Sequence, residues 1–172
     1  MTDYDVMYKY ISKNLLFDAN AAPKARGEIG TATPEEVRLV IYIIDTVTGR
    51  ILHPMSRHGC QGPVRAVFSE NWVVYHYFNL RAHRNEMSVV EVYDQTRAEN
   101  KDVWKFVLGK HNLTSPFSSY SRPEVIKSHS NFFTHSVKAI EVTSTAKGIT
   151  SKQVLIGTIG DQVLALDKRF NF

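Results

Sequence analysis

The fold is decided by the stretch Arg38-Leu39-Val40-Ile41-Tyr42-Ile43-Ile44-Asp45-Thr46-Val47-Thr48-Gly49-Arg50-Ile51-Leu52. Residues 38–44 are rich in β-branched and aromatic side chains, which suit the pleated surface of a strand. Asp45 can accept hydrogen bonds from the backbone that follows it, and Gly49 tolerates the positive φ that ends a turn. The stretch therefore predicts a β-hairpin with its turn over residues 45–50.

A second hairpin is predicted over residues 64–78, with a turn at Ser69-Glu70-Asn71. Its second strand, Trp72–Phe78, is apolar or aromatic at most positions. Because alternate residues of a strand point to opposite faces, both faces of this strand are predominantly apolar. We therefore expect this strand to be covered on both sides, with one face formed by Trp72, Val74 and Phe78 and the other by Val73, Tyr75 and Tyr77.

Three paired segments resemble one another along the chain. Each pair has an apolar first strand and a second strand that ends at an aspartate: Asp45, Asp94 or Asp167. In the third pair, a turn at Gly160-Asp161 joins the strands. We predict an all-β, antiparallel fold, and the separation of about 50 residues between Asp45 and Asp94 is within the range expected for four-stranded propeller blades or similar β arrays. The pairs are Asn14–Phe17 with Val40–Asp45, Asn71–Tyr75 with Val89–Asp94, and Val154–Gly157 with Val163–Asp167.

Length and composition bound the domain organisation. The chain has 172 residues, a net charge of +4, an apolar fraction of 43% and a charged fraction of 22%, which together indicate an ordered globular chain. We expect one region over residues 1–172, with polar loops at about 19–36 and 109–130. The sequence contains no apolar run long enough for a membrane span, and its acidic N-terminus does not resemble a signal peptide.

Candidate catalytic and metal sites are weak. The pairs His53 with His58 and His76 with His83 do not have the spacing of zinc ligands on a helix or a strand. Cys60 is the single cysteine, which excludes an internal disulfide, and we interpret it as a structural residue. Residues 157–160 lack the features of a phosphate-binding loop and predict a hairpin turn. The residues thus predict no catalytic, cofactor-binding or metal-binding side chain.

Two surface motifs remain. Arg81, His83 and Arg84 follow an aromatic strand, a combination that can bind single-stranded nucleic acid, although a solvated turn explains it better. Asn112-Leu113-Thr114 is an N-glycosylation sequon in a predicted loop. A glycan on Asn112 would require that this loop enter the secretory lumen.

Segments that resemble those of a known family occur in the same order along nearly the whole chain. The chain resembles the C-terminal region of the ER membrane protein complex subunit 1 family, and Tyr93-Asp94-Gln95 with residues 165–170 are most similar to its plant members. The segments that carry the likeness are Val40-Ile41-Tyr42-Ile43-Ile44-Asp45-Thr46-Val47-Thr48-Gly49-Arg50-Ile51-Leu52-His53, Gln61-Gly62-Pro63-Val64, Ser69-Glu70-Asn71-Trp72-Val73-Val74-Tyr75, Arg81-Ala82-His83-Arg84-Asn85-Glu86, Lys147-Gly148-Ile149-Thr150-Ser151-Lys152 and Leu155-Ile156-Gly157.

The resemblance implies a partial β-propeller of about two to three four-stranded blades. It also implies that this segment is lumenal and belongs to a large protein with one C-terminal transmembrane helix. Its complex inserts weakly hydrophobic and tail-anchored helices into the ER membrane without consuming nucleotide. On this basis we expect a fragment that acts as a non-catalytic scaffold, with the other subunits as partners, client membrane proteins contacted indirectly, and no nucleic acid or cofactor bound. A quinoprotein-like propeller enzyme and an RNA-binding β module are the alternatives.

Overall fold

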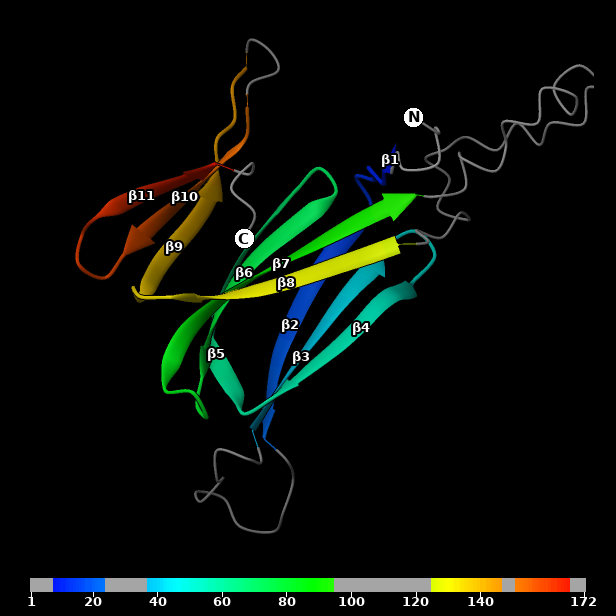
Figure 1. Cartoon of the computed structure of the whole chain (residues 1–172). Coiled ribbons are helices and arrows are strands. Elements are labelled where there is room, and N and C mark those ends of the chain that lie inside the picture. The colour runs from blue at the N-terminus through cyan, green and yellow to red at the C-terminus, as the bar shows by residue number, and fades with distance from the viewer. Residues whose placement is uncertain (1–7, 24–36, 95–124, 147–150, 168–172) are drawn as a thin grey trace, which may run out of the picture.

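The computed structural model describes residues 8–23, 37–94, 125–146 and 151–167. These ranges contain β-strands and no helix, and every strand pairing among them is antiparallel. The strands form three sheets that follow one another along the chain (Figure 1). The prediction of an all-β, antiparallel fold is confirmed.

The first sheet contains β2 (Leu15–Pro23), β3 (Val37–Asp45) and β4 (Arg50–His58), with β3 in the centre. It includes the hairpin predicted from residues 38–52. Alternate residues of β3 are buried, from Leu39 to Asp45, and the first three of them, Leu39, Ile41 and Ile43, pack in the core shared with the neighbouring sheet. The other face carries a row of three aliphatic side chains, because Leu16 lies opposite Ile44 and Ile44 lies opposite Ile51.

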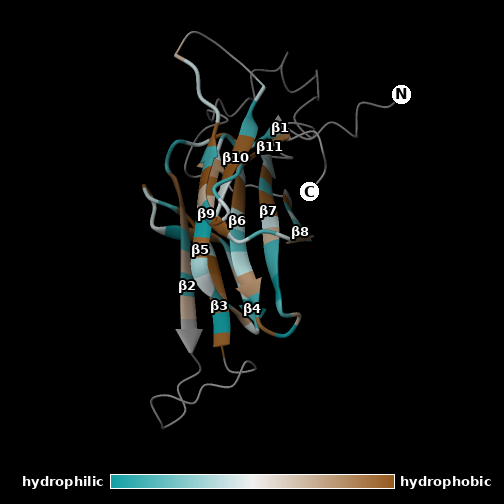
Figure 2. Cartoon of the chain, turned by 90° about the vertical axis from the view of Figure 1, so that its left-hand side faces the viewer, coloured by the Kyte–Doolittle hydropathy of each residue, from teal (hydrophilic) through white to brown (hydrophobic). Residues whose placement is uncertain are grey.

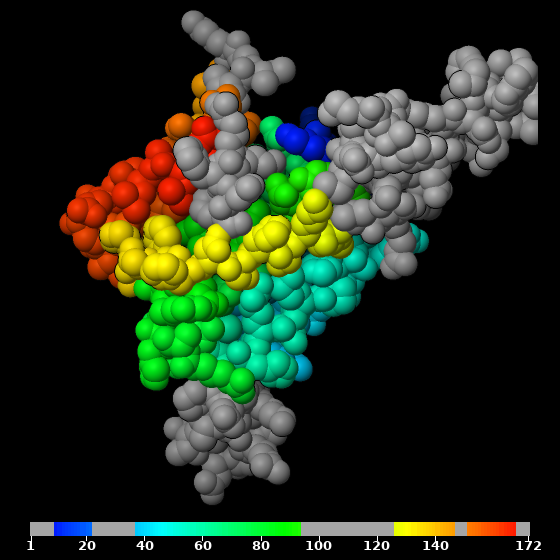
Figure 3. All heavy atoms as spheres, viewed as in Figure 1, coloured from blue at the N-terminus to red at the C-terminus, as the bar shows by residue number. Residues whose placement is uncertain are grey.

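The middle sheet has five strands, and four of them form a meander. It contains β5 (Cys60–Ser69), β6 (Trp72–Asn79), β7 (Arg84–Asp94) and β8 (Val125–Phe133), each paired with the next. The short strand β1 (Tyr8–Lys9) pairs with the end of β7. In Figure 3, β8 forms a band across the surface above the first sheet.

The third sheet contains β9 (Val137–Val142), β10 (Gln153–Thr158) and β11 (Val163–Asp167), with β10 in the centre. β5 contacts β2 and β3 on one side and β9 on the other. The middle sheet therefore lies between the first and the third sheet. Figure 2 shows hydrophobic and hydrophilic residues along the strands of the sheets.

Two hydrophobic clusters fill the spaces on either side of the middle sheet. Val73, Tyr75 and Tyr77 of β6 pack toward the first sheet, while Trp72 and Val74 pack toward the third. The prediction that this strand is covered on both faces is confirmed, although Phe78 is only half-buried. Since full burial of a large apolar side chain stabilises a fold by about 1.5–3 kcal/mol, β6 is a major source of stability for both clusters.

Strands extend into both predicted loops. Residues 19–23 continue β2, opposite Ile41 to Val37, and residues 125–130 belong to β8. In both places backbone pairing prevails over local composition, because polar side chains can face solvent from a strand at the edge of a sheet. Residues 24–36 and 109–124 lie outside the described part of the chain.

Candidate functional site: a polar cluster between the first two sheets

A polar cluster lies within the space between the first and the middle sheet. The cross-strand register places Tyr77 opposite Glu86, Tyr75 opposite Ser88, and Ser88 opposite Ser130. These residues therefore share the face of the middle sheet that looks toward β3 and β4. Arg57 of β4 reaches the same layer from the first sheet, because it lies opposite the buried residue Leu39.

Arg57 joins the two sheets through several groups. Its Nη2 donates a hydrogen bond of 2.6 Å to Ser130 Oγ, and its Nε donates one of 3.3 Å to Tyr75 Oη. The guanidinium carbon lies 5.5 Å from the centre of the Tyr77 ring, a cation–π arrangement. Arg57 is thus held by β6 and β8 at once, although it belongs to the neighbouring sheet.

Glu86 is the anionic centre of the cluster and is buried. Its carboxylate accepts hydrogen bonds from Tyr77 Oη (2.8 Å), Asn79 Nδ2 (3.1 Å) and Arg84 Nε (3.1 Å). Ser88 Oγ donates to Tyr77 Oη at 3.2 Å and lies 2.7 Å from Ser130 Oγ. A buried carboxylate is tolerated only when it is well bonded, and these three donors satisfy that requirement.

Burial changes the acid–base behaviour of the cluster. It raises the pKa of Tyr77 to about 12, and the hydrogen bond to Glu86 acts in the same direction. It also raises the pKa of the Cys60 thiol; Glu86 adds to this rise, while Arg57 and Arg81 oppose it. Both groups are therefore protonated near neutral pH. A reactive cysteine needs a lowered pKa and solvent access, and Cys60 has neither.

The geometry of the cluster indicates a structural role. In the described ranges, no group of three His, Cys, Asp or Glu side chains is arranged to hold a metal ion. Those same ranges contain no helix with the length and apolar character that crossing a membrane requires. What the cluster does is connect β4, β6, β7 and β8 by directional bonds in an otherwise apolar interface. Such bonds fix the orientation of one sheet relative to the other. Apolar contacts alone define this orientation less strictly.

The predicted turn aspartates take two different positions. Asp45 lies opposite Leu15 and Asp167 opposite Gln153, each facing the first residue of the preceding strand. Asp94 lies beyond that position and pairs with Tyr8 of β1. The three aspartates therefore do not occupy equivalent sites in their sheets.

The other predicted turn residues lie as follows. Asp45 Oδ1 accepts a hydrogen bond of 2.8 Å from Val47 N, and Gly49 closes the same turn with a φ of 68°. Gly160 lies in the turn between β10 and β11, where the positive φ of 56° falls on Asp161. Asn112 lies outside the described residues.

The members of each histidine pair differ in burial, whereas the basic cluster stays together around one turn. His53 is half-buried in β4, whereas His58 is exposed at its end; His76 is buried in β6, whereas His83 is exposed in the β6–β7 turn. Burial lowers the pKa of both His53 and His76. Arg81 and Arg84 lie in and just after the same turn as His83.

The sequence pattern does not predict the residues that build the polar cluster. The pattern predicts Tyr75 and Tyr77 only as positions on an apolar face, and it indicates no role for Arg57, Glu86 or Ser130. One signal was present: Glu86 and Ser88 alternate with the same period as Val90 and Val92, which places two polar residues on a buried face. Such a pattern indicates that polar partners must come from another strand.

Three successive antiparallel sheets, packed side by side in chain order and joined by Gly59 and by residues 134–136, define a segment of a β-propeller. The chain belongs to the ER membrane protein complex subunit 1 family. The sequence model described as "ER membrane protein complex subunit 1, second beta-propeller" matches residues 1–170. The predictions of this family and of a partial propeller are confirmed.

Individual relatives agree with this assignment. The chain is 37% identical over 170 residues to ER membrane protein complex subunit 1 of Xenopus laevis and 39% identical over 171 residues to that of Gallus gallus; each alignment covers 98% of the chain. It is 29% identical over 164 residues, or 92% of the chain, to the protein of the same name in Schizosaccharomyces pombe. The chain spans only 15–16% of the length of these relatives.

Proposed function

We propose that the chain is a non-catalytic scaffold segment of the ER membrane protein complex, positioned on the lumenal side of the ER membrane. Membership of the subunit 1 family supports a place in that complex, because its relatives are named as subunits of it. The polar cluster supports a structural role, since Arg57 of the first sheet donates hydrogen bonds to Tyr75 and Ser130 of the middle sheet. In the assembled complex, the propeller segment supports the insertion of transmembrane and tail-anchored proteins by holding other subunits in place.

The observation that carries this proposal beyond family membership is the outer face of the first sheet. Leu16 (51% exposed), Ile44 and Ile51 (46% exposed) form one aliphatic row across β2, β3 and β4. Within the described ranges, no other sheet covers this row. Large exposed apolar surfaces on a sheet favour contact with another protein surface. We infer that this face packs against a neighbouring part of the complex.

Charge substitutions on this face test the scaffold role. The double variant Leu16→Asp with Ile51→Asp places two carboxylates on the outer row and leaves the buried faces unchanged. We expect a tagged chain with these changes to be isolated with the other subunits much less efficiently than the wild type. Val47→Asp is the matched control, because Val47 is exposed in the adjacent turn and not in the row. Equal recovery of the double variant and the wild type would contradict the proposal.

Glycosylation of Asn112 tests the proposal that the chain lies on the lumenal side of the membrane. A chain delivered to the ER lumen is expected to carry a glycan on Asn112, detected as a mobility shift that a glycosidase removes and that Asn112→Gln abolishes. Protease added outside sealed ER vesicles supplies the second measurement. Digestion of the chain in intact vesicles would contradict the lumenal position.

A further inference from the structure

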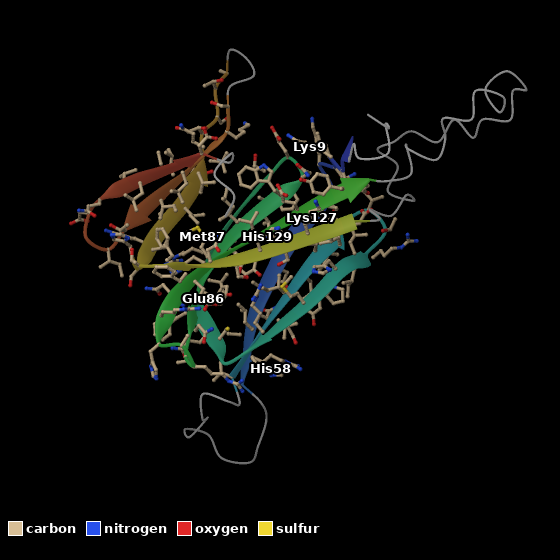
Figure 4. The ribbon with its side chains drawn as sticks, in the orientation of Figure 1. Lys9, His58, Glu86, Met87, Lys127 and His129 are labelled. Carbon is tan, nitrogen blue, oxygen red and sulfur yellow. The ribbon has the colours of Figure 1, made fainter. Side chains whose placement is uncertain are left out.

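One end of the molecule carries a group of exposed basic side chains, here called the basic end: Arg38, His58, Arg81, His83 and Arg84. Arg38 and His58 lie opposite each other in the β3–β4 pair. The three others lie in the turn from β6 to β7 and at the start of β7. Both places are at the lower end of the molecule in Figure 1, and Figure 4 labels His58 there.

Arg81 is held at the junction of the first two sheets. Gly59 links β4 to β5, and a Cβ atom at this position would lie 2.8 Å from Arg81 Cγ and 3.0 Å from its Nε. Leu80 N donates a hydrogen bond of 2.8 Å to Gly59 O, which fixes the turn against the same backbone. The side chain of Arg81 therefore lies across Gly59, directly after His58 in the chain. The positive charge of Arg81 thus lies close to the junction between β4 and β5.

The positive charge of the basic end exceeds the nearby negative charge. Arg84 donates to Glu86, whose side chain is 10% exposed and already accepts two other hydrogen bonds. Glu86 is the acidic residue that the described strands bring to this end, and it offsets one cation. Arg38 and Arg81 remain without a described carboxylate partner. Arginine pairs well with carboxylates because its planar guanidinium can donate two parallel hydrogen bonds.

The surface beside the basic end is suited to a polypeptide. Phe132 lies opposite Glu86 in the β7–β8 pair and is 63% exposed. β8 is the edge of its sheet within the described residues, so its outer backbone groups can pair with an added strand. Arginine and aromatic side chains together are typical of the strongly contributing parts of protein interfaces.

We propose that the basic end is a docking surface for an acidic polypeptide segment of a protein partner. Carboxylates of this segment pair with Arg38 and Arg81, and an apolar residue of it covers Phe132. Separate carboxylates along a chain match cations that are spread over two hairpins, whereas a single phosphate would need donors that converge on one point. This inference rests on the proposed scaffold role, since it assigns one class of partner to that scaffold.

Peptide binding to the full 172-residue chain tests the proposal. The probe is a fluorescent synthetic peptide of alternating glutamate and leucine, followed by anisotropy at low and at physiological salt. We expect saturable binding that weakens as salt rises. The double variant Arg38→Glu with Arg81→Glu is expected to bind about tenfold or more weakly, since it removes two bonds to carboxylates and adds two charges that repel the acidic peptide.

The matched control is Lys13→Glu with Lys138→Glu, which changes the net charge equally at exposed lysines outside the basic end. Circular dichroism spectra show whether each variant is folded, and the neutral pair Arg38→Gln with Arg81→Gln repeats the test without a charge reversal. A peptide methylated on alternate backbone nitrogens is expected to bind more weakly if it pairs with the edge of β8.

Several results would overturn the inference: no saturable binding, an equal loss in the control variant, or tighter binding of single-stranded RNA or anionic phospholipid vesicles than of the peptide. Binding that is seen only after Glu35→Gln and Glu36→Gln would assign the arginines to the chain's own acidic residues instead. Each of these results leaves recovery of the chain with the complex unaffected, so failure of this inference is distinguishable from failure of the scaffold proposal.

Discussion

Arg57 Nη2 of β4 lies 2.6 Å from Ser130 Oγ of β8, so the last strand of the first sheet is tied to the last strand of the middle sheet. The sequence separation of these two residues is 73, and apolar side chains form most of the core between their sheets. A hydrogen bond to a charged donor is directional, and it therefore specifies how the two blades are oriented. Substitution of either Arg57 or Ser130 removes this hydrogen bond, so its contribution to stability can be measured.

Replacing Arg57 with methionine is expected to lower the free energy of unfolding by about 1–3 kcal/mol, because the bonds to Ser130 and Tyr75 and the contact with the Tyr77 ring are lost. Thermal or urea denaturation measures the change. Arg38→Met is the matched control, since Arg38 is exposed on the neighbouring strand, and it is expected to change stability by less than about 0.5 kcal/mol. Equal effects of the two substitutions would contradict the role given to Arg57.

Because Tyr77 and Glu86 share a hydrogen bond, we expect the effects of substituting them on the free energy of unfolding to be coupled. Tyr77→Phe and Glu86→Gln each disturb a buried bond of 2.8 Å, so their effects on unfolding should not add. A double-mutant cycle is expected to give a coupling free energy of about 1 kcal/mol. Tyr93→Phe, which removes a bond to Glu91 instead, provides the control partner for Glu86→Gln, and strict additivity is expected for that pair.

Much of the fold could be predicted from local sequence. The β3–β4 hairpin follows from β-branched residues and a turn with Asp45 and Gly49, and the two-sided burial of β6 follows from its continuous apolar run. These features depend on residues close together in the chain. The repeat pattern predicts three similar hairpins, and the resemblance to the family is what predicts that they form a partial propeller.

The polar cluster could not be predicted in the same way. Arg57 and Ser130 are distant in sequence, and nothing near either residue indicates the other. The register that brings Ser88 to Ser130 is set by pairing between β7 and β8 across residues 95–124. The extent of β8 itself was underestimated, because its serines and histidine are typical of loops while its backbone pairs with Asn85 to Tyr93.

Alkaline pH is expected to weaken the interface between the first two sheets. The pKa of Tyr77 is raised from 10.0 to about 12, so the folded state holds this proton more tightly than the unfolded chain does. The resulting stabilisation is complete below pH 10 and is lost as the pH rises toward 12. In unfolding experiments across this window, Tyr77→Phe is expected to lose less stability than the wild type, by on the order of 2 kcal/mol. A wild-type decline no steeper than that of Tyr77→Phe would show that the phenol titrates normally.

Cys60 is expected to be chemically inert in the folded chain. The thiol is buried, donates toward His58 O at 3.7 Å, and has a raised pKa. A thiol reagent should therefore modify it slowly at neutral pH and rapidly once denaturant is added. Fast modification under native conditions would mean that Cys60 is exposed or activated.

The central claim, that this propeller segment is a scaffold part of the ER membrane protein complex, is tested most directly by sedimentation. The wild-type chain, tagged and delivered to the ER lumen, is solubilised from the membranes with a mild detergent and separated by size. We predict that it sediments together with the other subunits of the complex, far ahead of a free chain of 19.6 kDa. Sedimentation as a free folded chain, with none of it in the fractions that contain the complex, would contradict the account.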